Sequence, residues 1–298
     1  MSETDEGAMT TDHSGRNRSD RDDGRLRIAL PNKGRLADEA QALLERAGLE
    51  AAVTSDRSLR AELGDDFTAL FVRAKDIPEF VADGAADLGI TGSDLVTEAD
   101  RPLETLLRLG FGRCRLAIAA RDDGEWTRAE DLPDGVRIAT SFPQTTERWF
   151  RERGKTVELV PVSGAAEIAP HIGVADVIVD LVSTGSTLKM NGLREVATVL
   201  ESEAVLVARE GFAGNGAAGA GAAGAEADTS GAGTAGRVAE LVAALESVLR
   251  AQGRRYLMAN VPKGALDRVK EVLPGINGPT IIDVMDSGRH VAAHAVVA

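Results

Sequence analysis

The sequence is poor in cysteine, in aromatic side chains and in basic charge. It has 1 cysteine in 298 residues, so an internal disulfide is impossible and a reducing compartment, the cytoplasm, is predicted. Aromatic residues make up 3% of a chain that is 43% hydrophobic, so the cores must be built from Ala, Val, Leu and Ile. The net charge of -13 argues against a general nucleic-acid-binding surface, although a local pocket could still bind a nucleotide. No apolar run approaches the length of a membrane span, so no membrane partner is expected.

One stretch combines a buried strand with a turn suited to anions. The apolar run 174–182 predicts a strand of a parallel sheet, and a helix begins near Leu188. The turn between them is made of Ser183, Thr184, Gly185, Ser186 and Thr187. The first N–H groups of a helix lack internal partners, and a glycine lets a phosphate approach the backbone, so this turn predicts a phosphate site. Asp180 can accept hydrogen bonds from sugar hydroxyls, which together suits a ribose 5-phosphate. The alternative is an ordinary turn whose hydroxyls only cap the helix.

Three earlier segments also place polar groups where a predicted strand ends, which is the ligand-binding edge of open α/β sheets. The first strand, 26–30, is followed by Lys33, Gly34 and Arg35 at the start of a helix, where two cations suit a polyphosphate. A strand near 68–74 ends at Arg73. Another, 87–91, leads to Asp94. The alternatives are solvated cations in a loop and an acid that only supports the start of a helix.

Composition and periodicity divide the chain into five parts. We expect a disordered acidic tail at 1–24, an α/β lobe at 25–108 completed by 195–210, a second lobe at 109–194, a Gly/Ala-rich linker at 211–236, and a small α+β module at 237–298.

Several segments taken together resemble one family. They are Ala29-Leu-Pro-Asn-Lys-Gly-Arg-Leu36, Arg73-Ala-Lys-Asp-Ile-Pro78, Asp83-Gly-Ala-Ala-Asp-Leu-Gly-Ile-Thr-Gly-Ser-Asp94, and the run from Gly164 to Leu193 that contains the turn. The ordered set resembles the long form of the ATP phosphoribosyltransferases, which open histidine biosynthesis. The resemblance covers about Leu26 to Arg209 and resumes from about Val238 to the end.

The resemblance implies a fold and a reaction. The expected fold is a two-lobed α/β core like a class II periplasmic binding protein, with a C-terminal ferredoxin-like, ACT-like α+β regulatory domain. The implied reaction joins N1 of ATP to C1 of phosphoribosyl pyrophosphate and releases pyrophosphate, with Mg²⁺ on the leaving group. L-histidine is the implied inhibitor, and a homo-oligomer, dimer or hexamer, is the implied assembly.

The resemblance also assigns roles to residues. The turn, Ser183 to Thr187, would bind the 5-phosphate, and Asp180 would bind the ribose hydroxyls, with Asp176 and Glu167 as helpers. The groups expected to face ATP, pyrophosphate or Mg²⁺ are Lys33, Gly34, Arg35, Arg73, Asp94 and Glu167. Asp180, Lys33 and Arg35 are the expected catalytic residues. No dedicated set of metal ligands is identified, because Mg²⁺ bound largely by substrate phosphates needs few.

Two departures and two rival interpretations accompany the resemblance. The Gly/Ala tract is longer than a domain junction requires. A ferredoxin-like domain needs βαββαβ, whereas 237–298 predicts only βαββ, so we expect an incomplete domain and impaired histidine inhibition. The rivals are a solute-binding protein, which shares the fold, and a silent paralogue. The lack of an export signal at 1–24 argues against the first, and the intact turn with Lys33 and Arg35 argues against the second.

Overall fold

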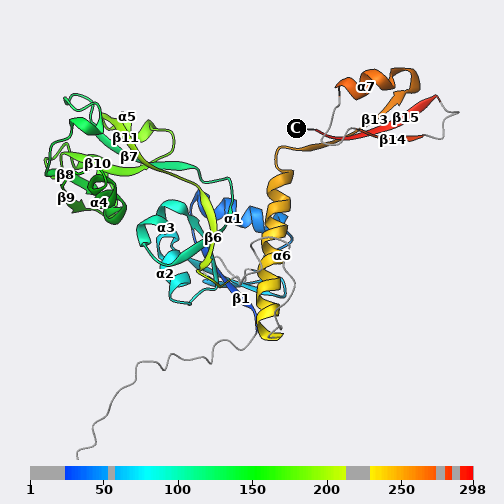
Figure 1. The fold of residues 1–298 in the computed structure, drawn as a ribbon, viewed down its shortest axis with the longest axis horizontal. Helices are drawn as coiled ribbons and strands as arrows, with labels where there is room; N and C mark the ends of the chain where they lie inside the picture. Colours follow the sequence, from blue (N-terminus) through cyan, green and yellow to red (C-terminus); the bar gives the residue numbers. More distant parts are fainter. Residues whose placement is uncertain (1–23, 53–57, 213–228, 273–278, 284–288, 298) are drawn as a thin grey trace, which may run out of the picture.

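The computed structural model describes residues 24–52, 58–212, 229–272, 279–283 and 289–297. Two α/β lobes come first, the long helix α6 (Thr229–Ala251) lies against the first lobe, and a small three-stranded module follows (Figure 1). Apart from Gly24, the predicted tail lies outside the described residues. None of the described helices has both the length and the apolar character needed to cross a membrane.

The first lobe is built on a seven-stranded sheet with the order β2-β3-β4-β1-β5-β12-β6. Its strands are β1 (Leu26–Pro31), β2 (Ala51–Ala52), β3 (Arg60–Leu63), β4 (Phe67–Val72), β5 (Leu88–Gly92), β6 (Leu103–Arg108) and β12 (Ala204–Arg209). Because β4, β1 and β5 are parallel, their carboxyl ends share one edge of the sheet. The segments that follow these ends are α1 (Arg35–Arg46), η2 (Ala74–Asp76) with α2 (Ile77–Ala82), and α3 (Ser93–Ala99).

The second lobe has a five-stranded sheet with the order β11-β7-β10-β8-β9. Its strands are β7 (Cys114–Arg121), β8 (Val136–Thr140), β9 (Val157–Pro161), β10 (Val177–Val182) and β11 (Leu193–Ser202). Its helical segments are η3 (Ala129–Asp131), α4 (Pro143–Arg151), η4 (Ala166–Ile168) and α5 (Ser186–Met190). β8 is parallel to β9 and β10, so α4 and α5 begin at the same edge of this sheet.

Both cores are mainly aliphatic, as the scarcity of aromatic residues predicts, although Phe67 and Phe71 are buried in the first and Phe142, Trp149 and Phe150 in the second. Fully buried side chains include Ile28, Leu30 and Leu88 in the first lobe, and Leu116 and Ile138 in the second. Their packing holds the parallel strands in register, and the register in turn aligns the strand ends that bear the polar segments.

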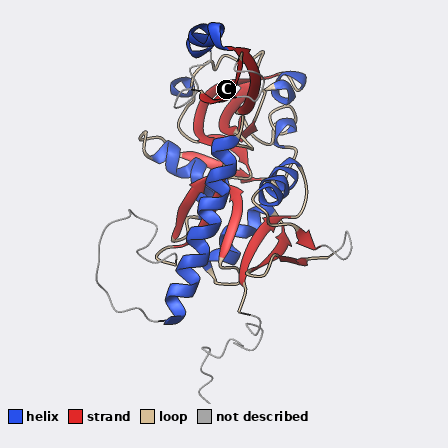
Figure 2. Ribbon diagram, turned by 90° about the vertical axis from the view of Figure 1, so that its right-hand side faces the viewer, coloured by secondary structure: helices blue, strands red, loops and turns tan. Residues whose placement is uncertain are grey.

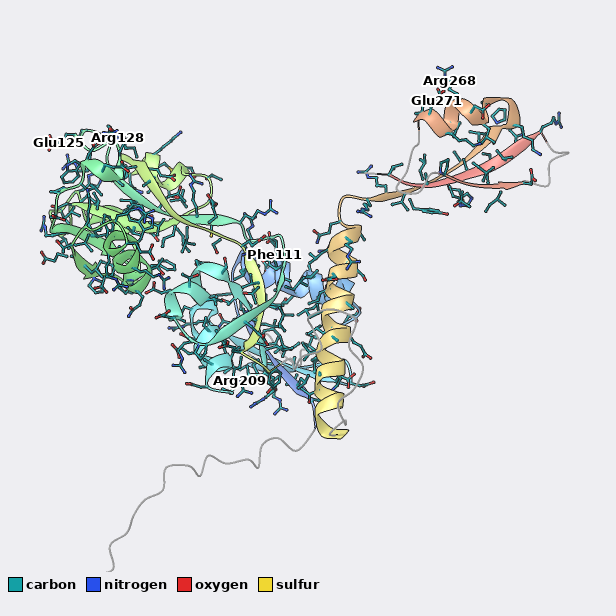
Figure 3. The ribbon with its side chains drawn as sticks, viewed as in Figure 1. Phe111, Glu125, Arg128, Arg209, Arg268 and Glu271 are labelled. Atoms are coloured by element: carbon teal, nitrogen blue, oxygen red, sulfur yellow. The ribbon has the colours of Figure 1, made fainter. Side chains whose placement is uncertain are left out.

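The chain crosses between the lobes twice, through residues 109–113 and through Glu203. Phe111 of the first crossing packs against the first core and lies where the lobes join (Figure 3). The second crossing corrects a predicted boundary. Residues 195–202 belong to β11 and pair with β7 in the second lobe, and only β12 completes the first sheet. The apolar residues of β11 pack on the second core, so the strand stays in that lobe.

Helix α6 corrects two further boundaries. It begins at Thr229, inside the predicted linker 211–236, of which 213–228 lie outside the described residues. Its apolar stripe, Val238, Leu241 and Leu245, is buried in the core of the first lobe rather than in the C-terminal module. Figure 2 shows the long helix running along the strands of the first lobe. A stripe of this kind predicts a buried helix face, but periodicity cannot show which neighbour covers it.

The C-terminal module is a three-stranded sheet with the order β13-β15-β14. Its elements are β13 (Arg255–Pro262), η6 (Lys263–Ala265), α7 (Leu266–Val272), β14 (Thr280–Asp283) and β15 (His290–Val297). The β-α-β-β order matches the first four elements of the expected ferredoxin-like domain. One face of β15 is buried, whereas Tyr256, Met258 and Ile282 on the opposite face of the sheet are exposed.

Candidate active site

The predicted phosphate turn lies between β10 and α5. Gly185 adopts the left-handed conformation, with φ 77° and ψ 2°, and immediately precedes the helix. The hydroxyls of Thr184 and Ser186 lie 2.9 Å apart, and the Ser186 N–H donates to Thr184 Oγ1 at 3.4 Å. The turn borders a pocket lined by Glu167, Asp180, Leu181, Val182, Ser183, Thr184, Gly185, Ser186, Thr187 and Leu188. Small hydroxyl side chains and a glycine therefore surround an open space at the strand end.

Two carboxylates share this pocket with the turn. Asp180 lies in β10, and its Oδ1 accepts the Leu181 N–H at 2.8 Å. Glu167 comes from η4, which follows Ala165 in a left-handed conformation, φ 52°. Burial raises the pKa of the Asp180 carboxyl, and the nearby charge of Glu167 adds to the increase. No lysine or arginine is among the described residues that line this pocket. Such a carboxylate fits a site that accepts sugar hydroxyls or a cation bound to substrate.

Arg115 supports the turn from the neighbouring strand. It lies opposite Val182 in the antiparallel pairing of β7 and β10. Its Nη1 donates to the carbonyl of Ser183 at 3.3 Å, and its Nη2 lies 2.7 Å from Glu195. The sequence patterns did not single out Arg115. Its signal was an arginine inside the otherwise apolar segment 114–120, which only the strand pairing connects to the turn.

Asp176 does not join this pocket, which corrects its predicted role. It precedes β10, at the opposite end of the strand from the turn. Its carboxylate accepts from the backbone N–H of Arg137 at 2.9 Å and from the Arg137 guanidinium at 2.7 Å. The hydrogen bond from Arg137 lowers the pKa of Asp176. Asp176 and Asp180 are four residues apart on an extended strand, so they cannot both reach the turn. The pairing with Arg137 gives Asp176 a structural role instead.

The first lobe presents its cations at the carboxyl ends of β1 and β4. Lys33 and Arg35 are exposed at the start of α1, and Gly34 between them has φ 80°. Arg73 is exposed at the end of β4, and the Asn32 N–H bonds to the carbonyl of the adjacent Val72 at 2.8 Å. The two loops therefore lie side by side at one edge of the sheet. That this group of cations faces a polyphosphate stays a prediction.

Glu39 connects Arg35 to the first crossing between the lobes. Its Oε1 accepts from Arg35 Nε at 2.9 Å, and its Oε2 accepts from the Gly112 N–H at 3.1 Å. Gly112 has φ +64°, and a Cβ there would lie 3.1 Å from Leu36 Cδ1, so the crossing needs glycine at this point. The cation at the start of α1 is thus held against the segment that joins the two halves of the molecule.

Asp94 is buried, which corrects its predicted exposure to ATP or Mg²⁺. Only 3% of it is exposed, and its carboxylate accepts from the hydroxyl of Ser202. Burial raises the pKa of this carboxyl. The Ser93 N–H bonds to the carbonyl of Glu203 at 2.9 Å, so the first turn of α3 holds the second crossing. In the sequence, an acid directly after Thr-Gly-Ser at the end of a strand predicts a ligand-binding residue. In the structure, this acid stabilises the junction of the lobes through Ser202.

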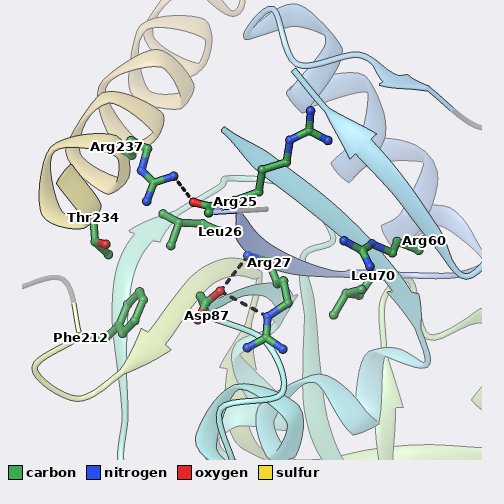
Figure 4. Close-up of a pocket in the computed structure, with 10 residues that line it drawn as sticks. Arg25, Leu26, Arg27, Arg60, Leu70, Asp87, Phe212, Thr234 and Arg237 are labelled. Carbon is green, nitrogen blue, oxygen red and sulfur yellow. Dashed lines mark hydrogen bonds and ion pairs between the residues drawn. The ribbon is translucent and has the colours of Figure 1, made fainter. Parts of the chain in front are cut away.

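A separate pocket of about 400 Å³ lies at the amino ends of β1 and β5, against α6 (Figure 4). There Arg27 bonds to Asp87 through its backbone N–H at 2.8 Å, and Arg237 donates to the carbonyl of Gly24 at 2.7 Å. The pocket is at the opposite end of the strands from Lys33 and Arg35, so it is not part of the site described above.

Comparisons with known proteins agree with the geometry. A family model described as ATP phosphoribosyltransferase matches residues 73–217, and one described as HisG, C-terminal domain, matches 251–298. The ATP phosphoribosyltransferase of Gemmatimonas aurantiaca is 55% identical over 275 residues, covering 91% of this chain and 89% of the relative. That of Haloarcula marismortui is 48% identical over 274 residues, with the same coverage of 91% and 89%.

Solved structures give the same result. The ATP phosphoribosyl transferase (HisG:HisZ) complex from Thermotoga maritima contains a chain that is 27% identical, with a TM-score of 0.62, over 76% of this chain and 100% of that one. The expected two-lobed α/β fold is thereby confirmed. The residues matched by the family model, 73–217, include those that line the pocket. The chain therefore belongs to the ATP phosphoribosyltransferase family and is an enzyme of the transferase class.

Proposed function

We propose that this enzyme joins N1 of ATP to C1 of 5-phosphoribosyl 1-pyrophosphate and releases pyrophosphate, as the first step of L-histidine biosynthesis. The main support is the pocket in which the Ser183–Thr187 turn and the carboxylates of Asp180 and Glu167 meet. The turn binds the 5-phosphate, and Asp180 accepts hydrogen bonds from the ribose hydroxyls. The family membership and the two groups of polar residues on facing lobes favour this reaction over solute binding.

The chemistry requires positioning and charge stabilisation rather than a protein nucleophile. Displacement at an anomeric carbon passes through a state with oxocarbenium character, and N1 of adenine is the nucleophile. Lys33, Arg35 and Arg73 stabilise the charge of the ATP phosphates and of the leaving pyrophosphate. The hydrogen bond from Arg35 Nε to Glu39, one turn further along the same helix, fixes the position of the Arg35 guanidinium.

Mg²⁺ is the proposed cofactor. The described residues contain no group of three or more His, Cys, Asp or Glu that could hold a metal by themselves. The pair of carboxylates in the pocket, Asp180 and Glu167, fits a cation that substrate phosphates bind in the main, because Mg²⁺ keeps several water or substrate ligands. When bound, the metal neutralises charge on the pyrophosphate.

The C-terminal module is the proposed site of L-histidine inhibition, and the enzyme is proposed to act in the cytoplasm as a homo-oligomer. The match of the C-terminal domain model to residues 251–298 supports the first point. The single cysteine supports a reducing compartment. The exposed apolar side chains on one face of the module support self-association.

The test is an absorbance assay with ATP, phosphoribosyl pyrophosphate and Mg²⁺ in high salt, with pyrophosphatase present and L-histidine added last. Formation of the ATP adduct supports the reaction. A halt on adding histidine supports inhibition and would refute the impairment that the βαββ pattern predicts. Folded protein that forms no adduct would contradict the proposal and favour solute binding. A Thr184→Ala, Gly185→Val double variant, which removes the phosphate turn, is the negative control.

A further inference from the structure

Helix α4 of the second lobe lacks a cap of its own. Its N-cap residue is Phe142, which has no side-chain acceptor, and its first residue is Pro143, which has no N–H. The Thr146 N–H bonds within the helix to the carbonyl of Phe142 at 3.0 Å. The backbone donors of Gln144 and Thr145 are therefore the two at this helix start that need an acceptor from elsewhere.

Glu98 of the first lobe supplies both acceptors. Its Oε1 accepts the Gln144 N–H at 2.9 Å, and its Oε2 accepts the Thr145 N–H at 2.9 Å. Glu98 lies near the end of α3, and α3 and α4 face each other where the lobes meet (Figure 1). A carboxylate at a helix N-terminus is also favoured by the helix dipole. One lobe thus completes a secondary-structure element of the other.

The rest of α3 fits the same role. Its first turn holds the second crossing through Ser93 and Asp94. Leu95 packs on the core of the second lobe, although it belongs to the first. At the far end of the helix, Asp100 lies 3.6 Å from Arg148 of α4, in an exposed position. Of these contacts, the one through Glu98 is the contact that caps α4, because its two carboxylate oxygens accept two backbone N–H groups at the start of that helix.

The contact lies next to the active site. Helix α4 begins at the carboxyl end of β8, and β8 is the parallel neighbour of β10, with Thr140 opposite Val179. The start of α4 and the phosphate turn therefore share one edge of the second sheet. Transfer needs that turn to meet the cations of the first lobe, so the angle between the lobes sets the distance between the reactants.

We propose that Glu98 is a positioning residue for the transfer reaction, which fixes the angle between the two halves of the active site by capping α4 from the opposite lobe. Glu98 does not line the phosphate pocket, and neither do Gln144 and Thr145, to which its two hydrogen bonds go. Its loss should therefore change the geometry in which the two substrates meet, rather than the affinity of the turn for its own substrate.

The experiment compares Glu98→Ala and Glu98→Gln with the control Asp100→Asn, all in a Cys114→Ser background. Asp100 has a left-handed backbone, φ 49°, which asparagine tolerates. The control therefore removes the exposed ion pair with Arg148, a contact between the same two helices that contributes little, and leaves the cap on α4 intact. Spin labels at Glu45→Cys and Glu152→Cys, both exposed and one in each lobe, report the distance between the lobes. Steady-state rates with both substrates, and calorimetric affinity for phosphoribosyl pyrophosphate alone, complete the set.

For Glu98→Ala we expect kcat to fall roughly 10²-fold, since displacements of about 1 Å have effects of that order. The distance distribution should broaden, while affinity for phosphoribosyl pyrophosphate alone stays within about twofold. Glu98→Gln, which keeps one acceptor, should be intermediate and remain folded, and Asp100→Asn should match the background. An unchanged kcat with a narrow distance distribution would overturn the proposal, as would a loss of affinity equal to the loss of kcat. The distances do not depend on the proposed reaction, so an inactive parent enzyme would refute that reaction alone.

Discussion

The two ends of strand β10 bear the same side chain and have opposite electrostatics. At its start, Asp176 is paired with Arg137, which lowers the pKa of the carboxyl. Near its other end, Asp180 is partly buried without a cation, which raises the pKa of that carboxyl. The first arrangement stabilises the fold, and the second leaves a carboxylate with acceptor capacity beyond the Leu181 N–H that it already accepts. This difference supports the proposal that the end of β10 with Asp180 is the functional one.

The largest expected effect is that of Asp180→Asn. The change removes a charged acceptor for the ribose hydroxyls, and hydrogen bonds to charged groups contribute about 1.5–3 kcal/mol, so kcat/KM should fall by roughly 10-fold to 150-fold. Steady-state kinetics with both substrates measures it. Asp176→Asn is the matched control and should keep kcat/KM within about twofold. Equal losses at the two positions would remove the distinction between the strand ends.

Two glycines make the next comparison, because each has a left-handed backbone near one end of the strand. Gly173 has φ +73° and Gly185 has φ +77°, and neither would bring an added Cβ into a close contact. Alanine at either position costs about 1–2 kcal/mol in backbone strain. Gly173→Ala should lose stability only, whereas Gly185→Ala should also weaken binding of phosphoribosyl pyrophosphate by roughly tenfold or more. Calorimetric titration and thermal melts separate the two results, and equal affinities would contradict the role of the turn.

The opposite pKa shifts predict opposite effects of pH on stability. Asp176 has a lowered pKa, so its contribution is present above the unfolded-state pKa and is lost as pH falls through the folded-state pKa. Asp180 has a raised pKa, so its contribution to the stability of the fold is present below the unfolded-state pKa and is lost as pH rises through the folded-state pKa. At neutral pH, Asp176→Asn should therefore destabilise by about 1 kcal/mol and Asp180→Asn should stabilise. Urea melts across the acidic range test both signs, and shifts of the same sign would refute the contrast.

The smallest effect is expected at Arg115, which supports the turn at the functional end. Arg115→Lys removes the paired contact with Glu195 and the 3.3 Å bond to the carbonyl of Ser183. Because the contact is partly exposed, the Kd of phosphoribosyl pyrophosphate should rise only a few-fold, about 1 kcal/mol or less. Calorimetric titration measures it. Arg121→Lys, at the other end of the same strand and paired with Asp123, is the control that should leave this Kd unchanged.

The sequence by itself determined most of the parallel strands, the position of the turn between β10 and α5, and the family. A strand that ends in Ser183-Thr184-Gly185-Ser186-Thr187 needs only local chemistry, since the N–H groups, hydroxyls and glycine of an anion site are neighbours in the chain. The positions of Asp180, Lys33 and Arg35 at strand ends were predictable for the same reason. Each occurs where a predictable strand gives way to a predictable helix.

The tertiary structure decided which residues that are distant in the sequence contact each other. Only strand pairing brings Arg115 to the turn, and only the crossing of the chain buries Asp94 against Ser202. The assignments of residues 195–202 and of α6 depended on which core covers an apolar face, and periodicity leaves that open. The contact between Glu98 and α4 joins residues that are 46 and 47 positions apart along the chain, in different lobes. Such contacts follow from packing and from the need of backbone donors at a helix start for acceptors, neither of which a local pattern contains.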